Sequence, residues 1–139
     1  MVKVEWEGDL RFRAEMPDGT GFLMDSATDG PSPVQTLAAS IAACAAMDVI
    51  SILLKQRQDV KNYRVEIEYE RPPQGAYPRP ITSAKIIHVL EGTNINQAAL
   101  KRAIELSDEK YCSVQATLRT NPKVTSEWKV VEPVEAPRD

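Results

Sequence analysis

Apolar and polar positions alternate with period two in the first quarter of the chain. The alternation is clearest at positions 2–6 and 10–14, and a shorter apolar run occupies 21–24. A period of two is typical of a β-strand that buries one of its faces. The cluster Pro17-Asp18-Gly19-Thr20 between the second and third runs is rich in turn-forming residues. The pattern therefore predicts a small antiparallel meander of three strands.

A long apolar segment follows and predicts a helix. Ser32 suits the N-cap, and Pro33 suits the first helical position, where its missing N–H would have no partner anyway. The segment continues to about Lys55 or Arg57 and is apolar nearly all the way round, which indicates a helix covered on most sides. Its many alanines would let another backbone approach closely. We therefore expect this helix at the centre of a homodimer.

The remaining elements are predicted from the same two periodicities. They are strands at 63–70 and 81–90 with a proline-rich loop at 72–80, an amphipathic helix capped by Asn94 or Asn96, a short helical stretch at 112–118 after a break at 107–111, and a last strand at 126–131. The order βββ-α-ββ-αα-β, in a single domain over 1–139, predicts an α+β fold.

Charge and composition exclude several classes of partner. The net charge is −3 and the basic residues are scattered, which argues against nucleic acid and against an anionic membrane surface. The segment 37–54 is apolar enough to raise the question of a membrane span. The segment is short for a membrane-spanning helix, and it is also more polar than most, because it contains Asp48 and many alanines. We interpret it as a buried helix of a soluble, cytoplasmic protein.

The two cysteines are the first candidates for chemistry. Cys44 lies mid-helix, where a free cysteine is most often a small buried hydrophobe. Cys112 is expected at the start of a short helix, whose dipole would favour the thiolate, although it too could merely fill a corner. Asp48 lies four residues after Cys44 and so on the same helix face, where its carboxylate opposes a thiolate unless a cation intervenes. Arg11 and Arg13 are candidates for that cation, although strand arginines are more often solvated.

Other kinds of site find little support in the sequence. Two cysteines and the single His88 lack the paired spacings of zinc sites, so we expect no metal and no other cofactor. His88 lies on a strand face without a visible catalytic partner, which is typical of a partly exposed or hydrogen-bonded histidine. A static structural disulfide is also unexpected in a cytoplasmic protein.

Two segments together resemble the signatures of the OsmC/Ohr superfamily. The first is similar to the central-helix signature and reads Ser32-Pro33-Val34-Gln35-Thr36-Leu37-Ala38-Ala39-Ser40-Ile41-Ala42-Ala43-Cys44, continuing with Met47-Asp48-Val49 as in the OsmC-like branch. The second is Lys110-Tyr111-Cys112-Ser113-Val114, which is similar to the cysteine element that follows an amphipathic helix in that family. The resemblance covers about 30–131. Either segment alone would be a weak signal.

The resemblance implies an intertwined homodimer around the central helix and a thiol-dependent peroxidase for organic hydroperoxides. Cys44 would attack the O–O bond as a thiolate and become a sulfenic acid. Cys112 would then condense with Cys44 to a disulfide, which an external dithiol reduces. No metal or flavin is implied, and the expected role is stress defence.

One departure from the family pattern leaves alternatives open. Well-studied peroxidases of the family carry a Glu directly after the helix-start proline, and this Glu organises an Arg beside the first cysteine. Here that position is Val34, followed by Gln35. Arg11 and Arg13 are the candidates for the Arg, and Asp48 is a candidate to hold it.

Three readings follow. The first is the peroxidase. The second is an OsmC-like binding or redox-sensor module with little turnover, and the third is a structural dimer whose cysteines only fill core space.

Overall fold

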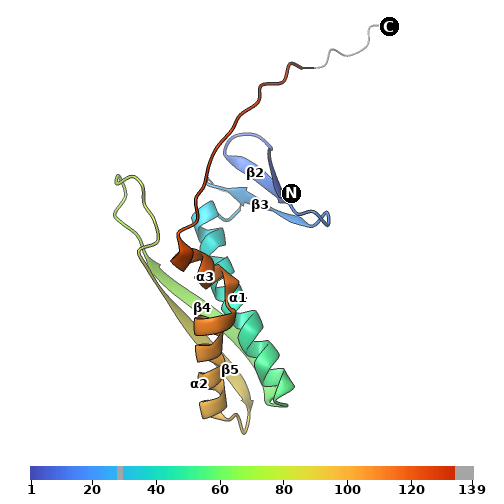
Figure 1. Cartoon of the computed structure of the whole chain (residues 1–139), viewed down its shortest axis with the longest axis vertical. Helices are drawn as coiled ribbons and strands as arrows, with labels where there is room; N and C mark the ends of the chain where they lie inside the picture. Colours follow the sequence, from blue (N-terminus) through green and yellow to red (C-terminus); the bar gives the residue numbers. More distant parts are fainter. Residues whose placement is uncertain (28–29, 134–139) are drawn as a thin grey trace.

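The computed structural model describes residues 1–27 and 30–133 and has the predicted α+β fold. Its elements in chain order are β1 (Lys3–Trp6), β2 (Arg11–Glu15), β3 (Gly21–Asp25), α1 (Pro33–Lys55), β4 (Asp59–Glu70), β5 (Ser83–Thr93), α2 (Gln97–Leu106), a π-helical turn (Ser107–Tyr111) and α3 (Ser113–Thr120). The predicted order of strands and helices is confirmed as far as α3. Figure 1 shows the three-stranded sheet at one end of the long helix α1 and the β4–β5 hairpin along its length.

The three N-terminal strands form the predicted meander. β2 pairs antiparallel with both β1 and β3. The turn between β2 and β3 is closed by two bonds, since the Met16 N–H donates to the Thr20 carbonyl and the Asp18 carboxylate accepts from the Thr20 N–H. The cross-strand partners Trp6 and Phe12 share one face of this sheet, and both are exposed in a single chain. That face therefore lacks a complete cover within one chain.

Helix α1 begins where the sequence predicts. The Ser32 side chain accepts from the backbone N–H of Gln35, and the Gln35 side chain accepts from the backbone N–H of Ser32, which completes a capping box. The helix is long and apolar enough to cross a membrane by length and composition, and a third of its most apolar window is buried inside the protein. It packs against β4 and α2.

Strands β4 and β5 form a two-stranded antiparallel ladder that runs from Asp59 opposite Thr93 to Glu70 opposite Ser83. Half-buried and exposed side chains alternate along β4, as the period-two pattern requires. β4 begins four residues before its predicted start, and β5 begins two residues later and ends three residues later than predicted. The extension at the start of β4 includes a register shift between Val60 and Asn62.

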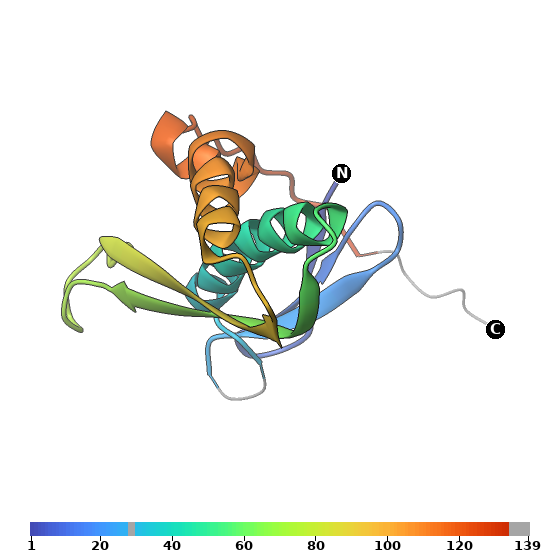
Figure 2. The ribbon, with the colours of Figure 1, turned by 90° about the horizontal axis from the view of Figure 1, so that it is seen from below.

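The core lies where α1, α2 and the hairpin meet. Its centre consists of Val49 and Leu53 from α1 and Ala103 from α2, all of which are buried. Asn96 caps α2 through a bond that its side chain accepts from the Ala99 N–H. Seen from the end of the molecule, α1 and α2 lie on the same side of the hairpin (Figure 2).

The last predicted strand does not form. Residues 121–133 have no regular secondary structure and are exposed, and Figure 1 shows the chain leaving the body of the molecule after α3. Trp128 is 87% exposed. An alternating pattern specifies a strand only if a neighbouring strand can accept its ladder bonds, and no strand of the described part of the chain pairs with this segment. The prediction for 126–131 was wrong for this reason.

Candidate functional site

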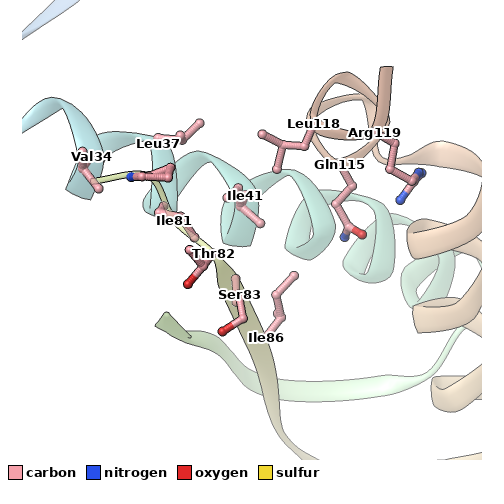
Figure 3. Close-up of a pocket in the computed structure, with 12 residues that line it drawn as sticks. Val34, Leu37, Ile41, Ile81, Thr82, Ser83, Ile86, Gln115, Leu118 and Arg119 are labelled. Carbon is pink, nitrogen blue, oxygen red and sulfur yellow. The ribbon is translucent and has the colours of Figure 1, made fainter. Parts of the chain in front are cut away.

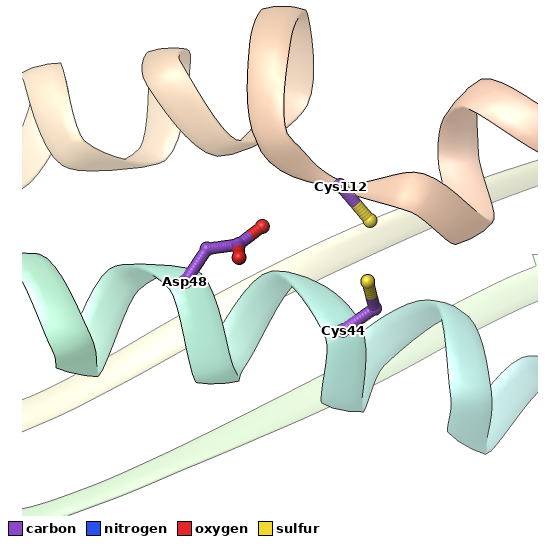
Figure 4. Close-up of side chains that lie close together, drawn as sticks. All are labelled: Cys44, Asp48 and Cys112. Atoms are coloured by element: carbon purple, nitrogen blue, oxygen red, sulfur yellow. The ribbon is translucent and has the colours of Figure 1, made fainter.

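The two cysteines, which are far apart in the sequence, meet at one place in the fold. Cys44 and Asp48 lie one turn apart on the same face of α1, and Cys112 faces them from the start of α3 (Figure 4). The Sγ atoms of both cysteines and a carboxylate oxygen of Asp48 all lie within 4.8 Å of one another. We call this group the Cys44–Asp48–Cys112 cluster.

The π-helical turn before α3 positions Cys112. The Cys112 N–H donates to the Ser107 carbonyl at 2.8 Å, which closes the turn, and the Cys112 carbonyl accepts from the Ala116 N–H at the start of α3. The Ser107 hydroxyl, which is fully buried, donates to Asp48 Oδ2 at 2.9 Å. This bond ties the turn to α1. No local sequence pattern points to Ser107, because its partner lies 59 positions away.

The two thiols differ in exposure and in electrostatics. Cys112 is 2% exposed, whereas Cys44 is only half-buried. Burial raises the pKa of the Cys112 thiol above its ordinary value, and the adjacent Cys44 acts in the same direction. The amides of Gln115 and Val114 at the start of α3 lower it, but by less. The start of α3 thus favours the Cys112 thiolate, as the sequence suggested, but burial outweighs this effect.

The other residues expected near the thiols lie elsewhere in this chain. Arg13 forms a salt bridge with Glu7 at 2.9 Å, and Arg11 lies 3.7 Å from the buried carboxylate of Asp25. Gln35 is engaged in the capping box of α1. Of the expected supporting residues, Asp48 alone joins the cysteines in the cluster.

An apolar groove of about 540 Å³ lies beside α1 (Figure 3). Its walls come from α1, from the segment that leads into β5, and from α3. The lining residues are Val34, Leu37, Ile41, Pro80, Ile81, Thr82, Ser83, Ala84, Ile86, Gln115, Leu118 and Arg119. Leu37 and Ile41 precede Cys44 at helical spacings of seven and three, so they share its face of α1. Gln115 likewise follows Cys112 by three positions. The groove therefore lies along the face of α1 that carries Cys44, and neither thiol is among its lining residues.

His88 belongs to a separate pair. The Tyr63 hydroxyl and His88 Nδ1 lie 2.6 Å apart across the β4–β5 ladder, so His88 is hydrogen-bonded as expected. Burial lowers the pKa of His88, which Asp108 partly offsets, and burial raises the pKa of Tyr63 to about 12. Both groups are therefore neutral at pH 7. The cluster of thiols and carboxylate does not include His88.

The arrangement of the cluster allows two kinds of chemistry. Two thiols at this separation can be joined by oxidation, because a disulfide needs its sulfurs about 2.05 Å apart and side-chain rotation moves each sulfur. Two sulfurs and a carboxylate oxygen are also donors that a thiophilic metal ion accepts.

Comparison with known proteins gives consistent matches. The family described as OsmC-like protein matches residues 25–127. Protein YhfA of Escherichia coli (strain K12) is 37% identical over 132 residues, which cover 94% of this chain and 97% of that protein. A hypothetical protein from Aquifex aeolicus VF5 has a similar structure, with a TM-score of 0.75, 30% identity and 86% of each chain covered. The organic hydroperoxide resistance protein OhrB of Bacillus subtilis has a TM-score of 0.52 at 16% identity, with 84% of this chain and 90% of that chain covered. At this low identity the comparison shows a similar fold only.

Proposed function

The chain belongs to the OsmC-like protein family, and from this premise we propose that it is a thiol-dependent peroxidase that reduces organic hydroperoxides in stress defence. The observation that carries the proposal is the approach of Cys44 and Cys112 within 4.8 Å across α1 and α3. Membership of a family whose solved structures include hydroperoxide resistance proteins agrees with this role.

The difference between the two thiols supports a division of roles. Cys44 is the more accessible and lies on the face of α1 that continues into the apolar groove. Its thiolate attacks the O–O bond, so that the sulfur is oxidised to a sulfenic acid and the hydroperoxide is reduced to an alcohol. Cys112 is buried and has a raised pKa, which suits a thiol that reacts second. It displaces water from the sulfenic acid to form the disulfide, and an external dithiol then restores both thiols.

The apolar groove supports an organic rather than an inorganic peroxide as substrate. Valine, leucine and isoleucine side chains supply half of its lining, and a hydrocarbon tail bound there would be removed from water. Hydrogen peroxide has no such tail and would gain nothing from this surface. The proposal therefore predicts a preference for cumene hydroperoxide over hydrogen peroxide, seen as a higher kcat/KM.

A homodimer is part of the proposal. One chain leaves large apolar side chains exposed on the N-terminal sheet and on α1, among them Trp6 at 68% and Met47 at 69%. The apolar surface of α1 continues round the helix onto this exposed side, as in a helix covered on most sides. A second copy would cover these surfaces. Light scattering during size-exclusion chromatography should give twice the mass of the chain; the monomer mass at micromolar concentration would reject the dimer.

Variants of the two cysteines test the proposed chemistry. Cys44→Ser should abolish consumption of cumene hydroperoxide with dithiothreitol as reductant. Without reductant, Cys112→Ser should consume one equivalent and accumulate a sulfenic acid at Cys44 that dimedone traps. Gln74→Ala, at an exposed position of the loop between β4 and β5, is the control and should match the wild type. Full activity in Cys44→Ser would reject the peroxidase.

A second function, an OsmC-like binding or redox-sensor module with little turnover, is favoured by the electrostatics of the site. Val34 stands in place of the expected Glu, and the two N-terminal arginines contact other carboxylates. Among the described residues, Asp48 has no salt bridge with Lys or Arg. Without a nearby cation, alkylation of Cys44 by iodoacetamide at pH 6 should be slow. Fast alkylation at pH 6 would count against this module and for the peroxidase.

A further inference from the structure

The same three side chains that hold the thiols together are also a set of metal ligands. We propose that the Cys44–Asp48–Cys112 cluster, when reduced, binds a thiophilic divalent cation, for which Zn²⁺ is the best fit, and that the bound ion withholds the dithiol from oxidation. The binding itself is independent of the proposed peroxidase activity. Only the protective effect rests on that activity.

The spacing of the donor atoms fits such an ion. In tetrahedral zinc sites the Zn–S distance is about 2.3 Å and the Zn–O distance about 2.0–2.2 Å, so the donors lie roughly 3.5–3.8 Å apart. The three donors here lie within 4.8 Å of one another before any ion is bound. Binding would therefore draw the donors together by at most about 1.3 Å. Cys44 is only half-buried, which leaves solvent access for a water molecule as fourth ligand.

The surroundings of Asp48 resemble those of a metal-binding carboxylate. Carboxylates that bind metals are usually oriented by a hydrogen bond from a neighbouring group, and losing that partner weakens binding. Ser107 supplies such a bond from a fully buried position, at 2.9 Å from Asp48 Oδ2. The Ser107 backbone carbonyl also accepts from the N–H of Cys112. A single residue thus fixes two of the three ligands relative to each other.

Charge gives a further reason for a cation. The Asp48 carboxylate lies beside both thiols, and in the described part of the chain no Lys or Arg forms a salt bridge with it. A divalent ion that replaces the two thiol protons would offset most of the charge of the resulting thiolates and the carboxylate. Binding releases the two thiol protons to solvent, and nothing is oxidised or reduced.

This inference differs from the expectation drawn from the sequence, which considered only cysteine and histidine spacings. Cys44 and Cys112 come from different helices, and the third ligand is a carboxylate. No linear spacing could reveal this combination, because it depends on how α3 packs against α1.

A titration of the tag-free, fully reduced protein with Co²⁺ under anaerobic conditions tests the site. Wild type should bind one Co²⁺ per chain with thiolate-to-cobalt charge-transfer absorption, and Zn²⁺ should displace it. Cys44→Ser and Cys112→Ser should each lose about half of that absorption, and Asp48→Asn should weaken binding at least tenfold. Ser107→Ala should weaken Zn²⁺ binding by about 10- to 100-fold, whereas the control Gln74→Ala, at an exposed loop position, should leave it unchanged.

Two results would overturn the inference. The first is the absence of charge-transfer absorption in reduced wild type. The second is Zn²⁺ affinity that the cysteine and Asp48 substitutions do not change. Circular dichroism of each variant shows whether it is folded, and Asp48→Asn retains an oxygen for the Ser107 hydroxyl, so it serves where a cysteine variant fails to fold.

The protective effect needs its own measurement. The zinc-loaded wild type should form the disulfide with cumene hydroperoxide at least tenfold more slowly than the metal-free protein, and EDTA should restore the rate. Equal rates would overturn the protective effect while leaving the binding site intact. If the metal-free protein does not react with the hydroperoxide at all, it is the proposed peroxidase that fails, and the Co²⁺ titration still decides the metal site.

Discussion

Oxidation of the two cysteines should stabilise the protein measurably. The perturbation is one equivalent of cumene hydroperoxide added to the reduced protein, which should join Cys44 to Cys112. The new bond would close a loop of about 68 residues, from position 44 to position 112. Loop-closure entropy for that length is about 15 cal/mol/K, which corresponds to about 4 kcal/mol at 25 °C if the bond forms without strain.

The structure allows an estimate of the shift in Tm. A chain of 139 residues unfolds with an entropy of roughly 0.3 kcal/mol/K, so that 4 kcal/mol corresponds to about 14 °C. The sulfurs, now within 4.8 Å, must close to about 2.05 Å, and the strain of that movement reduces the gain. We therefore expect the Tm to rise by about 7–14 °C, with dithiothreitol reversing the change.

Differential scanning calorimetry at a fixed chain concentration measures this shift, because the Tm of a dimer depends on concentration. Intact-mass spectrometry of the same sample verifies that two hydrogens have been lost. Cys112→Ser treated in the same way is the control and should not gain stability. A verified disulfide with an unchanged or lowered Tm would refute the reasoning, since the sulfurs would then meet only by distorting the fold.

Three further predictions concern the fold around the site. Proton NMR of the single histidine should give a pKa for His88 below 6.5. Because His88 then binds a proton more readily in the unfolded chain than in the folded one, the free energy of unfolding should fall as the pH drops below about 6.5. A His88 pKa at or above 6.5 would contradict this. Val49→Ala should lower the free energy of unfolding, measured by urea denaturation, by about 2 kcal/mol, because Val49 is fully buried in the core. Val124→Ala, at an 87% exposed position, should lower it by less than about 0.5 kcal/mol. Equal losses would refute the assignment of the core. Ser32→Ala removes the side chain that accepts from the Gln35 N–H at 3.1 Å and should lower the free energy of unfolding by about 1 kcal/mol in the same assay. An unchanged urea midpoint would show that the cap contributes nothing to stability.

Much of the fold could be predicted from local patterns. The N-terminal meander and α1 have signals within a few residues, such as the turn at Asp18 and the cap at Ser32. The segment 126–131 shows the limit of this approach. Its alternation resembles that of β4, but a strand needs a neighbour, and periodicity does not say which backbone would supply one.

The site was less accessible to sequence reasoning than the fold. Cys44 and Cys112 were selected together only through a family resemblance, because neither spacing nor composition indicates their approach. Ser107 was missed since its role depends on a partner in another helix. For Cys112 the effect of the helix start could be inferred from neighbouring residues, whereas the larger, opposing effect of burial could not, because burial depends on the packing of the whole chain.

The most direct test of the central claim is a peptide map of the reduced protein after reaction with less than one equivalent of cumene hydroperoxide. The account predicts one intramolecular cross-link, between the peptide that contains Cys44 and the peptide that contains Cys112, formed in proportion to the hydroperoxide consumed. Hydroperoxide consumed while both cysteines remain reduced, or cross-links found only between separate chains, would contradict it.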